Sequence, residues 1–422
     1  MSRELATATT REPLTLRSFR RYWTASSVGF AGMALTTVAV DVLVIDVLKA
    51  SEAQVGLVRA SQFLPYLVLG LVAGAQVDRW RRRRVLIGFN LAQALLLLGI
   101  PLLYAAGALS VTSTAVVLFA SGCCAVYVAA AEQAYLPDLV PRRTLVLANA
   151  RLGQAMSVAQ TLGPAVAGFL VAAVSAPVTL VVSSLARGFN AMSIFRIRRP
   201  EPPRDVERRP IVREIGEGLS FTYRHQTLAP LAVSTHVWFL ANSIAVTLLG
   251  LFVLRDLSLS AAAYGAVLTA AGVGSLLGAL AAPRAARRLG EGNVIIVSRA
   301  ACALAWAAIA FTPTAAATSV IIGYLGVLQL LCGASMGLED PSEMGYRQAV
   351  TPRVMLGRVN SVLRSANRSM AVVGALVGGV LATAFSFRTT LLAVAALFLT
   401  AALVGAGSPL RGARSGRVPV AP

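Results

Sequence analysis

Charged residues are scarce in this chain. Only 13% of its 422 residues are charged and 56% are apolar, and the mean hydropathy is +0.71. A soluble domain has about a quarter of its residues charged and about half apolar. The shortage of charge therefore excludes an ordinary soluble fold and indicates a protein embedded in a lipid bilayer.

Cysteine, histidine and lysine are nearly absent. The four cysteines lie inside apolar runs, which excludes a disulfide framework and a zinc-ligand spacing. His225 and His236 are the only histidines, and Lys49 is the only lysine. A histidine-based metal site and a Walker A lysine are therefore excluded, and with them a single-chain ATP-driven pump. Paired acids at metal spacing and a Ser/His/Asp set are missing too, so we expect no metal, no cofactor and no enzymatic activity.

The apolar residues suffice for twelve membrane crossings. Each crossing needs about 20 apolar residues, hence roughly 240 for twelve, and 56% of 422 residues is about 236. Charge breaks and turn residues predict helices at 22–48, 54–77, 85–106, 111–136, 146–173, 177–195, 226–254, 261–283, 292–312, 316–346, 356–384 and 388–407. The first is too long for the core of a signal peptide, so we expect it to be retained.

The net charge of +20 comes from arginines that cluster between the apolar runs. These clusters alternate with connections that carry almost no charge, unlike the continuous basic face of a nucleic-acid-binding protein. By the positive-inside rule, the side that carries the clusters is cytoplasmic. We therefore expect a multi-pass protein of the cytoplasmic membrane, with both termini in the cytosol and no nucleic-acid partner.

A polar segment divides the chain into two halves. Residues 198–204 read Arg-Arg-Pro-Glu-Pro-Pro-Arg, a composition that suits a solvated linker. The predicted organisation is a cytosolic tail (1–21), a six-helix bundle (22–195), a cytosolic linker (196–225), a second six-helix bundle (226–407) and a cytosolic tail (408–422). A shift of 211 residues pairs Glu132 with Glu343 and Tyr135 with Tyr346. Two parallel repeats of six helices are the architecture of many secondary transporters.

The connection after the second predicted helix carries a family motif. Its characteristic residues are Gly74, Asp78, Arg79, Arg82 and Arg83, followed by Leu86. Their spacing resembles the signature between helices 2 and 3 of the major facilitator superfamily, from which residues 76 and 81 depart. The resemblance implies an all-α membrane protein with twelve transmembrane helices in two pseudo-symmetric six-helix bundles.

The same resemblance implies a conformational latch at the cytosolic side. In the family, the aspartate of the motif pairs with an arginine at the start of helix 11, and an arginine pairs with an acid at the end of helix 4. Carried over, Asp78 would meet Arg358, and Arg82 would meet Glu132 or Asp138. The alternative for the arginines is that they only set the topology at the headgroups.

A second motif lies in the fifth predicted helix. Gly163, Pro164 and Gly168 resemble the antiporter motif of the superfamily, with Ala159 and Ala167 in glycine positions. The resemblance favours export, whereas the alternative is that small residues only allow close helix packing. Segments 19–23, 64–66, 136–141, 264–265 and 357–361 also resemble the enterobactin-exporter-like and macrolide-efflux-like branch of the superfamily.

Asp41 is the first candidate for a coupling acid. It lies within the first predicted helix, where a charge at the bilayer centre costs about 2.5–3.5 kcal/mol on insertion scales. Such residues are functional candidates by default, so Asp41 is a candidate for carrying a proton or recognising a cation. The alternative is a static ion pair with Arg59 of the next helix.

Two charged faces lie on the tenth and eleventh predicted helices. Glu339 and Glu343 share one helix face, with Asp340 beside them. Arg364 and Arg368 are also four residues apart. The acid face would neutralise the basic face, either as a contact that breaks when the halves rock or as a permanent clamp.

The resemblance implies a secondary active transporter that exports small amphiphilic organic molecules, such as drugs, antibiotics, siderophores or other secondary metabolites. Proton antiport with alternating access is the expected mechanism. We expect a monomer with a mostly apolar cavity and sparse polar anchors such as Asn242. Its partners would be the substrate, the proton and the lipid bilayer. An importer or a proton-independent facilitator is the alternative, and a non-transporting membrane sensor is a remote one.

Overall fold

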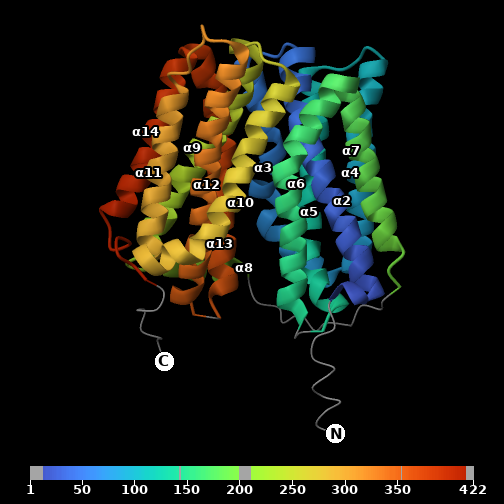
Figure 1. Ribbon diagram of the computed structural model, residues 1–422. Helices are drawn as coiled ribbons and strands as arrows, with labels where there is room; N and C mark the ends of the chain where they lie inside the picture. Colours follow the sequence, from blue (N-terminus) through green and yellow to red (C-terminus); the bar gives the residue numbers. More distant parts are fainter. Residues whose placement is uncertain (1–12, 142–143, 199–210, 353, 415–422) are drawn as a thin grey trace.

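The computed structural model describes residues 13–141, 144–198, 211–352 and 354–414. Within these ranges the chain is a bundle of long helices without strands (Figure 1). The first half contains η1 (Pro13–Thr15), α2 (Arg17–Val42), η2 (Leu43–Val47), α3 (Glu52–Arg79), α4 (Arg82–Ala105), α5 (Val111–Leu139), α6 (Leu145–Val174) and α7 (Ala176–Phe195). After α8 (Ile211–Arg224), the second half contains α9 (Leu228–Leu251), η4 (Phe252–Asp256), α10 (Ala261–Leu289), α11 (Glu291–Ile309), α12 (Thr318–Val350), α13 (Leu356–Ala384) and α14 (Phe387–Ala406).

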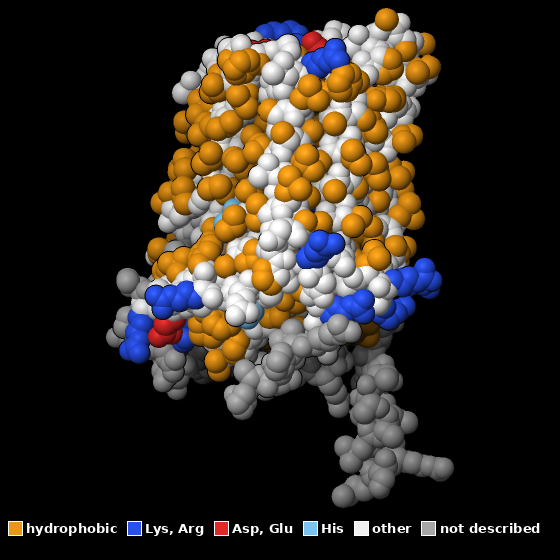
Figure 2. Space-filling view, turned by 90° about the vertical axis from the view of Figure 1, so that its left-hand side faces the viewer, with side chains coloured by type: hydrophobic (Ala, Val, Ile, Leu, Met, Phe, Trp, Pro, Cys, Tyr) orange, Lys and Arg blue, Asp and Glu red, His pale blue; other side chains and the backbone are white. Residues whose placement is uncertain are grey.

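Most of these helices suit a bilayer. Eleven of them, counted over the described residues, are long and apolar enough to cross a membrane. The remaining long helix, α3, has 28 residues and packs between α5 and α13. Apolar side chains cover the flank of the molecule between its two ends (Figure 2). The predicted all-α membrane fold is confirmed, since helices satisfy their backbone hydrogen bonds internally in lipid.

Each half joins its six long helices in the same order. In the first half, α2 packs on α6 and α7, α7 packs on α4, and α5 connects α4 with α3. In the second half, α9 packs on α13 and α14, α14 packs on α11, and α12 connects α11 with α10. The order is that of two copies of one unit, as the internal repeat predicts. The halves meet along two seams, α3 with α13 and α6 with α10.

The two ends of the bundle differ in charge. Arginine side chains gather at the end of the bundle where α2 begins and α14 ends (Figures 1 and 2). We call it the basic end; it includes the exposed Arg79, Arg81 and Arg287. The opposite end, the distal end, holds the π-helical segments η2 and η4. This asymmetry is the one that a positive-inside arrangement requires.

The second part of the linker is a helix, whereas the sequence predicts a solvated segment throughout 196–225. Helix α8 packs against α13 and α9 at the basic end. Its Gly218 and Thr222 lie one turn apart and are buried. The absence of a Cβ at Gly218 allows α8 to lie against the backbone of Arg358. The proline-rich composition just upstream obscures this pattern, and residues 199–210 lie outside the described ranges.

Helices α10 and α12 approach each other very closely. Gly274 and Gly278 of α10 face the backbone of α12, and Gly333 and Gly337 of α12 face the backbone of α10. A Cβ at any of these four positions would collide with a carbonyl oxygen. Small residues four apart on both helices permit this contact. It makes α10 and α12 a tightly packed unit of the second half.

Candidate substrate cavity and charge clusters

Asp41 lies on the seam between the halves, toward the distal end. Its Oδ2 accepts a hydrogen bond from Arg59 Nη2 at 2.6 Å and another from the Tyr264 hydroxyl at 2.9 Å. Arg59 belongs to α3 of the same half, whereas Tyr264 belongs to α10 of the other half. Asp41 is 4% exposed and Tyr264 is 1% exposed. The pair with Arg59 matches the alternative drawn from the sequence, and Tyr264 turns it into a contact between the halves.

A second polar contact joins the halves at the distal end. Arg255 of η4 donates to Glu52 Oε1 of α3 at 2.7 Å and to the backbone oxygen of Ala50. Nearby, Gly56 of α3 and Gly379 of α13 let the two helix backbones touch. These contacts lie within the first turns of α3 and the last turns of α13, so they close the distal end.

The antiporter-like motif of α6 lies at two close contacts. Gly163 faces the side chain of Ala34 on α2, within the first half. Gly168 faces α10 at Gly265, where the carbonyl oxygen of Pro164 is also close. Pro164 stands inside the helix. The motif thus contributes to the seam between α6 and α10, as close packing of small residues allows.

A hollow opens within the first half. It has about 470 Å³ of empty space, part of it open to solvent, and side chains from α2, α3, α4, α5 and α7 line it. Phe30, Met33 and Val128 supply apolar surface, whereas Glu132 and Arg187 supply opposite charges that act on each other. We call it the first-half hollow. Polar side chains also line it, namely Ser26, Tyr66, Gln93, Glu132, Arg187 and Asn190, so apolar and polar groups face the same space.

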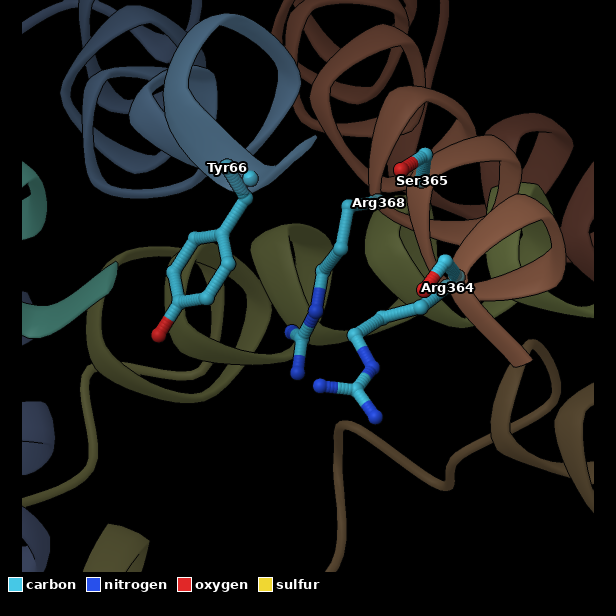
Figure 3. A pocket seen from close by; sticks show the side chains of 6 residues that line it. Tyr66, Arg364, Ser365 and Arg368 are labelled. Atoms are coloured by element: carbon cyan, nitrogen blue, oxygen red, sulfur yellow. The ribbon is translucent and has the colours of Figure 1, made fainter. Parts of the chain in front are cut away.

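A second hollow lies between the halves, at the seam of α3 and α13. Tyr66 and Gly70 line it from α3, and Ser361, Arg364, Ser365 and Arg368 line it from α13 (Figure 3). The guanidinium of Arg368 stands over the Tyr66 ring, 5.0 Å from its centroid. We call it the seam hollow. Tyr66 lines both hollows, so they adjoin at this side chain.

The second half contains a buried charge cluster centred on Arg299 of α11. This side chain is fully buried and donates to Glu339 Oε1 of α12 at 2.7 Å. It also reaches Glu343 Oε2 at 3.3 Å and Thr235 Oγ1 at 2.9 Å, and it contacts Ser234. The acid face of α12 therefore pairs with Arg299 in this conformation. The predicted pairing with Arg364 and Arg368 is wrong for it, because those two side chains point into the seam hollow.

Sequence reasoning missed Arg299 although a signal was present. It lies in the middle of a predicted transmembrane helix, where any arginine is a functional or structural candidate. Asp340, next to the buried acids, is exposed. Asn242 is partly exposed on α9 and is not among the residues that line either hollow. Their predicted parts in transport stay predictions.

The residues of the predicted latch have different surroundings. Arg82 pairs with Asp138 at 3.3 Å, the second of the two acids considered for it. Arg83 donates to the backbone oxygen of Phe195 and so caps the end of α7, while Arg79 is exposed. Gly74 and Asp78 belong to α3, but the surroundings of the Asp78 side chain are not described, so its pair with Arg358 stays a prediction. Arg358 contacts Glu217 of α8.

Two six-helix halves of the same build, with hollows in the first half and between the halves, are the architecture of a secondary transporter, and comparison with known proteins agrees. The sequence model of a family described as "Transmembrane secretion effector" matches residues 8–420. The chain belongs to this family of the major facilitator superfamily, which confirms the resemblance in the motifs.

Similar proteins cover nearly the whole chain. The "Multidrug efflux pump Tap" of Mycolicibacterium fortuitum is 28% identical over 415 residues, 96% of this chain and 97% of that protein. The structure of the nucleoside transporter NupG has a TM-score of 0.76 at 13% identity and covers 92% of this chain and 98% of its own. A bacterial homologue of the lysosomal transporter Spinster has a TM-score of 0.72 at 13% identity, with coverages of 94% and 97%. The structural likeness shows the fold.

Proposed function

We propose that this protein exports small amphiphilic organic molecules across the cytoplasmic membrane in exchange for protons. The family is one of membrane transporters, and the similar Tap protein is called a multidrug efflux pump. The basic end would face the cytosol, because arginine-rich connections stay on that side. Both termini would then be cytosolic. A monomer is the working unit in this proposal.

The closed distal end supports loading of the substrate from the cytosol. The contacts of Tyr264 with Asp41 and of Arg255 with Glu52 close the distal half of the seam. The seam hollow instead lies beside Ser361 and Arg364, in the first three turns of α13 and toward the basic end. A cavity reached from the basic end and closed at the distal end would take up substrate from the cytosol.

The walls of the first-half hollow support an amphiphilic substrate. Phe30, Met33 and Tyr66 offer apolar and aromatic surface, and methionine adapts to ligands of different shape. Glu132 and Asn190 supply isolated polar groups.

Proton coupling is assigned to Asp41 in this proposal. As a carboxylate, it holds both Arg59 and the hydroxyl of Tyr264. A proton on Asp41 would remove its charge and weaken both hydrogen bonds, because bonds to an ionised acceptor are the stronger ones. Protonation from outside would thus change the balance between an open and a closed distal end, which resets the transporter.

Everted vesicles test this proposal. They are energised to build a pH gradient, and amphiphilic antibiotics and siderophores are added while a pH-sensitive dye reports the gradient. We expect substrate to dissipate the gradient with wild type and with Asp46→Asn, a half-exposed acid one turn away, but not with Asp41→Asn. Accumulation of labelled substrate inside everted vesicles is the export direction.

Other outcomes would change the proposal in defined ways. If substrate also dissipates the pH gradient with Asp41→Asn, Asp41 is not the coupling acid, and the acids of α12 become the next candidates. Substrate movement without any dissipation would overturn proton antiport and leave facilitated export. Loss of labelled substrate from preloaded everted vesicles against a gradient would reverse the direction.

A further inference from the structure

Arg364 and Arg368 stand out among the arginines of the membrane-spanning helices. Arg59 and Arg299 each hold a carboxylate at hydrogen-bond distance. Arg368 instead stands over the rings of Phe63 and Tyr66, and its neighbour Arg364 points into the same hollow (Figure 3). Neither forms an ion pair with an acidic side chain in the part of the chain that the structure describes. Two guanidiniums thus face one cavity without a counter-charge.

The surroundings of this pair increase its positive charge. Arg368 and Arg347 are the cationic neighbours that act on Arg364, and both repel it. Arg347 already pairs with Glu343 at 3.3 Å, and Glu343 also serves Arg299. Glu339 and Glu343 of α12 are therefore already paired. An anion that enters the seam hollow would meet a site that attracts it.

The helix face around the two arginines also consists of donors. Ser361, Arg364, Ser365 and Arg368 recur at the spacing of one face of α13, and all four line the seam hollow. Guanidinium groups only donate hydrogen bonds, and serine hydroxyls can donate as well. A carboxylate or another oxyanion accepts several such bonds at once, and charge-assisted bonds of this kind are the strong ones.

The apolar part of a ligand has a place next to this site. Tyr66 lines the seam hollow and the first-half hollow together. A molecule whose anionic group lies between the arginines could therefore place an aromatic body against Tyr66, Phe30 and Met33. We propose that Arg364 and Arg368 bind the anionic group of the substrate, so that this transporter favours amphiphilic organic anions. This inference rests on the proposed export function and names its substrate class.

The position of the site connects binding with the transport cycle. The seam hollow lies between the two halves, with Arg368 already over Tyr66 of α3, so closing the basic end would remove the remaining water from the two arginines. Two unpaired cations that lose water in this way are unfavourable. A bound anion neutralises them, so closure is expected to follow binding of an anion rather than of a cation.

Two dyes with the same xanthene body provide the test. Fluorescein is anionic and rhodamine 123 is cationic, and fluorescence polarisation measures their binding to the purified protein in nanodiscs of phosphatidylcholine. We expect fluorescein to bind about 10- to 100-fold more tightly than rhodamine 123, the range of one or two charge-assisted hydrogen bonds. In the variant R364Q/R368Q this preference should disappear. The matched control is Arg388→Gln, which removes an arginine that stands 4.2 Å over Phe311 at the distal end.

A further variant distinguishes the effect of charge from that of guanidinium geometry. R364K/R368K keeps both charges but not the planar forks, and we expect it to retain a weaker preference for fluorescein. Equal affinities of wild type for both dyes, or a preference for rhodamine 123, would overturn the proposal. A preference that persists in R364Q/R368Q would overturn the assignment to these residues. If phosphatidylglycerol in the nanodisc abolishes fluorescein binding, a lipid headgroup occupies the site and the substrate assignment is wrong.

Transport is measured separately, so the two proposals can fail independently. Everted vesicles that accumulate rhodamine 123 but not fluorescein would keep export and reject the anion site. Fluorescein that binds through the arginines but leaves the vesicles instead of entering them would keep the anion site and reject export.

Discussion

The two halves of this protein use equivalent helix positions in opposite ways. Asn90 and Arg299 each lie eight residues after the first residue of their helices, α4 and α11, which occupy equivalent places in the repeat. Arg299 is buried among two acids and two hydroxyls. Asn90 is equally buried but donates only to the backbone of its own helix, at Leu86. One half therefore stores a charge cluster in its core where the other has a single amide.

The acids follow the same division. Glu343 contributes to the core cluster, whereas its repeat partner Glu132 lines the first-half hollow with Arg187. Close glycine contacts between α10 and α12 add to the rigidity of the second half. The second half therefore pairs its buried charges with one another, whereas Glu132 and Arg187 of the first half both line a hollow.

Removal of Arg299 should have the largest effect. Arg299→Met leaves Glu339 and Glu343 buried without their cation, and breaking a buried pair costs about 3–5 kcal/mol. Thermal unfolding of the purified protein would measure this loss. The matched variant Arg187→Met should destabilise the protein far less, because Arg187 faces a hollow. Equal losses for both arginines would contradict the division between the halves.

Replacing Arg299 and Glu339 together, by the residues at the corresponding positions of the first half, should recover most of the stability lost in Arg299→Met. Asn90 and Arg299 correspond by their place within α4 and α11, and the shift of 211 residues sets Val128 against Glu339, so R299N/E339V gives the second half the residues of the first. Replacement of both members of a buried ion pair is often neutral, and we expect a coupling energy of about 2–3 kcal/mol in a double-mutant cycle. Additive single effects would mean that the two side chains do not depend on each other.

Neutralisation of Glu132 and of its repeat partner Glu343 should have different effects on stability and on transport. Glu132→Gln should lower substrate export strongly but destabilise the protein less than Glu343→Gln, because Glu132 forms no ion pair within the described residues, whereas Glu343 pairs with Arg299 and Arg347. Glu343→Gln should do the reverse, with a larger loss of stability. Vesicle transport and thermal unfolding are measured on the same preparations. Identical profiles for the two variants would remove the functional difference between the halves.

The contact of Tyr264 with Asp41 should have a moderate effect on conformation. Tyr264→Phe removes one hydrogen bond between the halves, worth about 0.5–1.5 kcal/mol. The population with an open distal end should rise by about 2- to 13-fold. Spin labels on Ala173→Cys and Thr389→Cys, one on each half, would report a longer label-to-label distance in Tyr264→Phe than in the protein that keeps Tyr264. Unchanged distances would show that packing alone keeps this end closed.

The smallest effect is expected at the start of α9. His225 Nδ1 accepts hydrogen bonds from the N–H groups of Thr227 and Leu228, at 3.3 and 3.2 Å. Burial lowers the pKa of His225, so the folded protein favours the neutral ring. Stability is therefore complete above the unfolded value of about 6.5 and falls as pH drops through the lower folded pKa.

Loss of this cap should cost about 0.5–1 kcal/mol. Melting temperatures of wild type and His225→Asn at pH 7.5 and 5.5 would show it, with the pH-dependent part reduced in the variant. The first half offers a contrast, because Leu16 precedes α2 without any side-chain cap. An unchanged pH dependence in His225→Asn would assign the titration to another group.

The sequence by itself determined the membrane fold. Hydropathy set the helix count, because a bilayer allows few alternatives to long apolar helices, and the arginine clusters and the repeat set the division into halves. The motif at 74–86 indicated the superfamily. Asp41 and Arg59 could be considered as a pair, since the ends of adjacent helices meet across a short connection.

Only the tertiary structure decided which charges neutralise each other. Helix spacing suggested that the acids of α12 pair with Arg364 and Arg368, but in the structure they pair with Arg299. Arg364 and Arg368 instead line the seam hollow, where they form the proposed anion site. Tyr264 meets Asp41 from 223 residues away, and α8 gains its stability from α13. Spacing along one helix predicts which residues share a face. The partner of that face depends on how separate helices pack, and this is a property of the whole bundle.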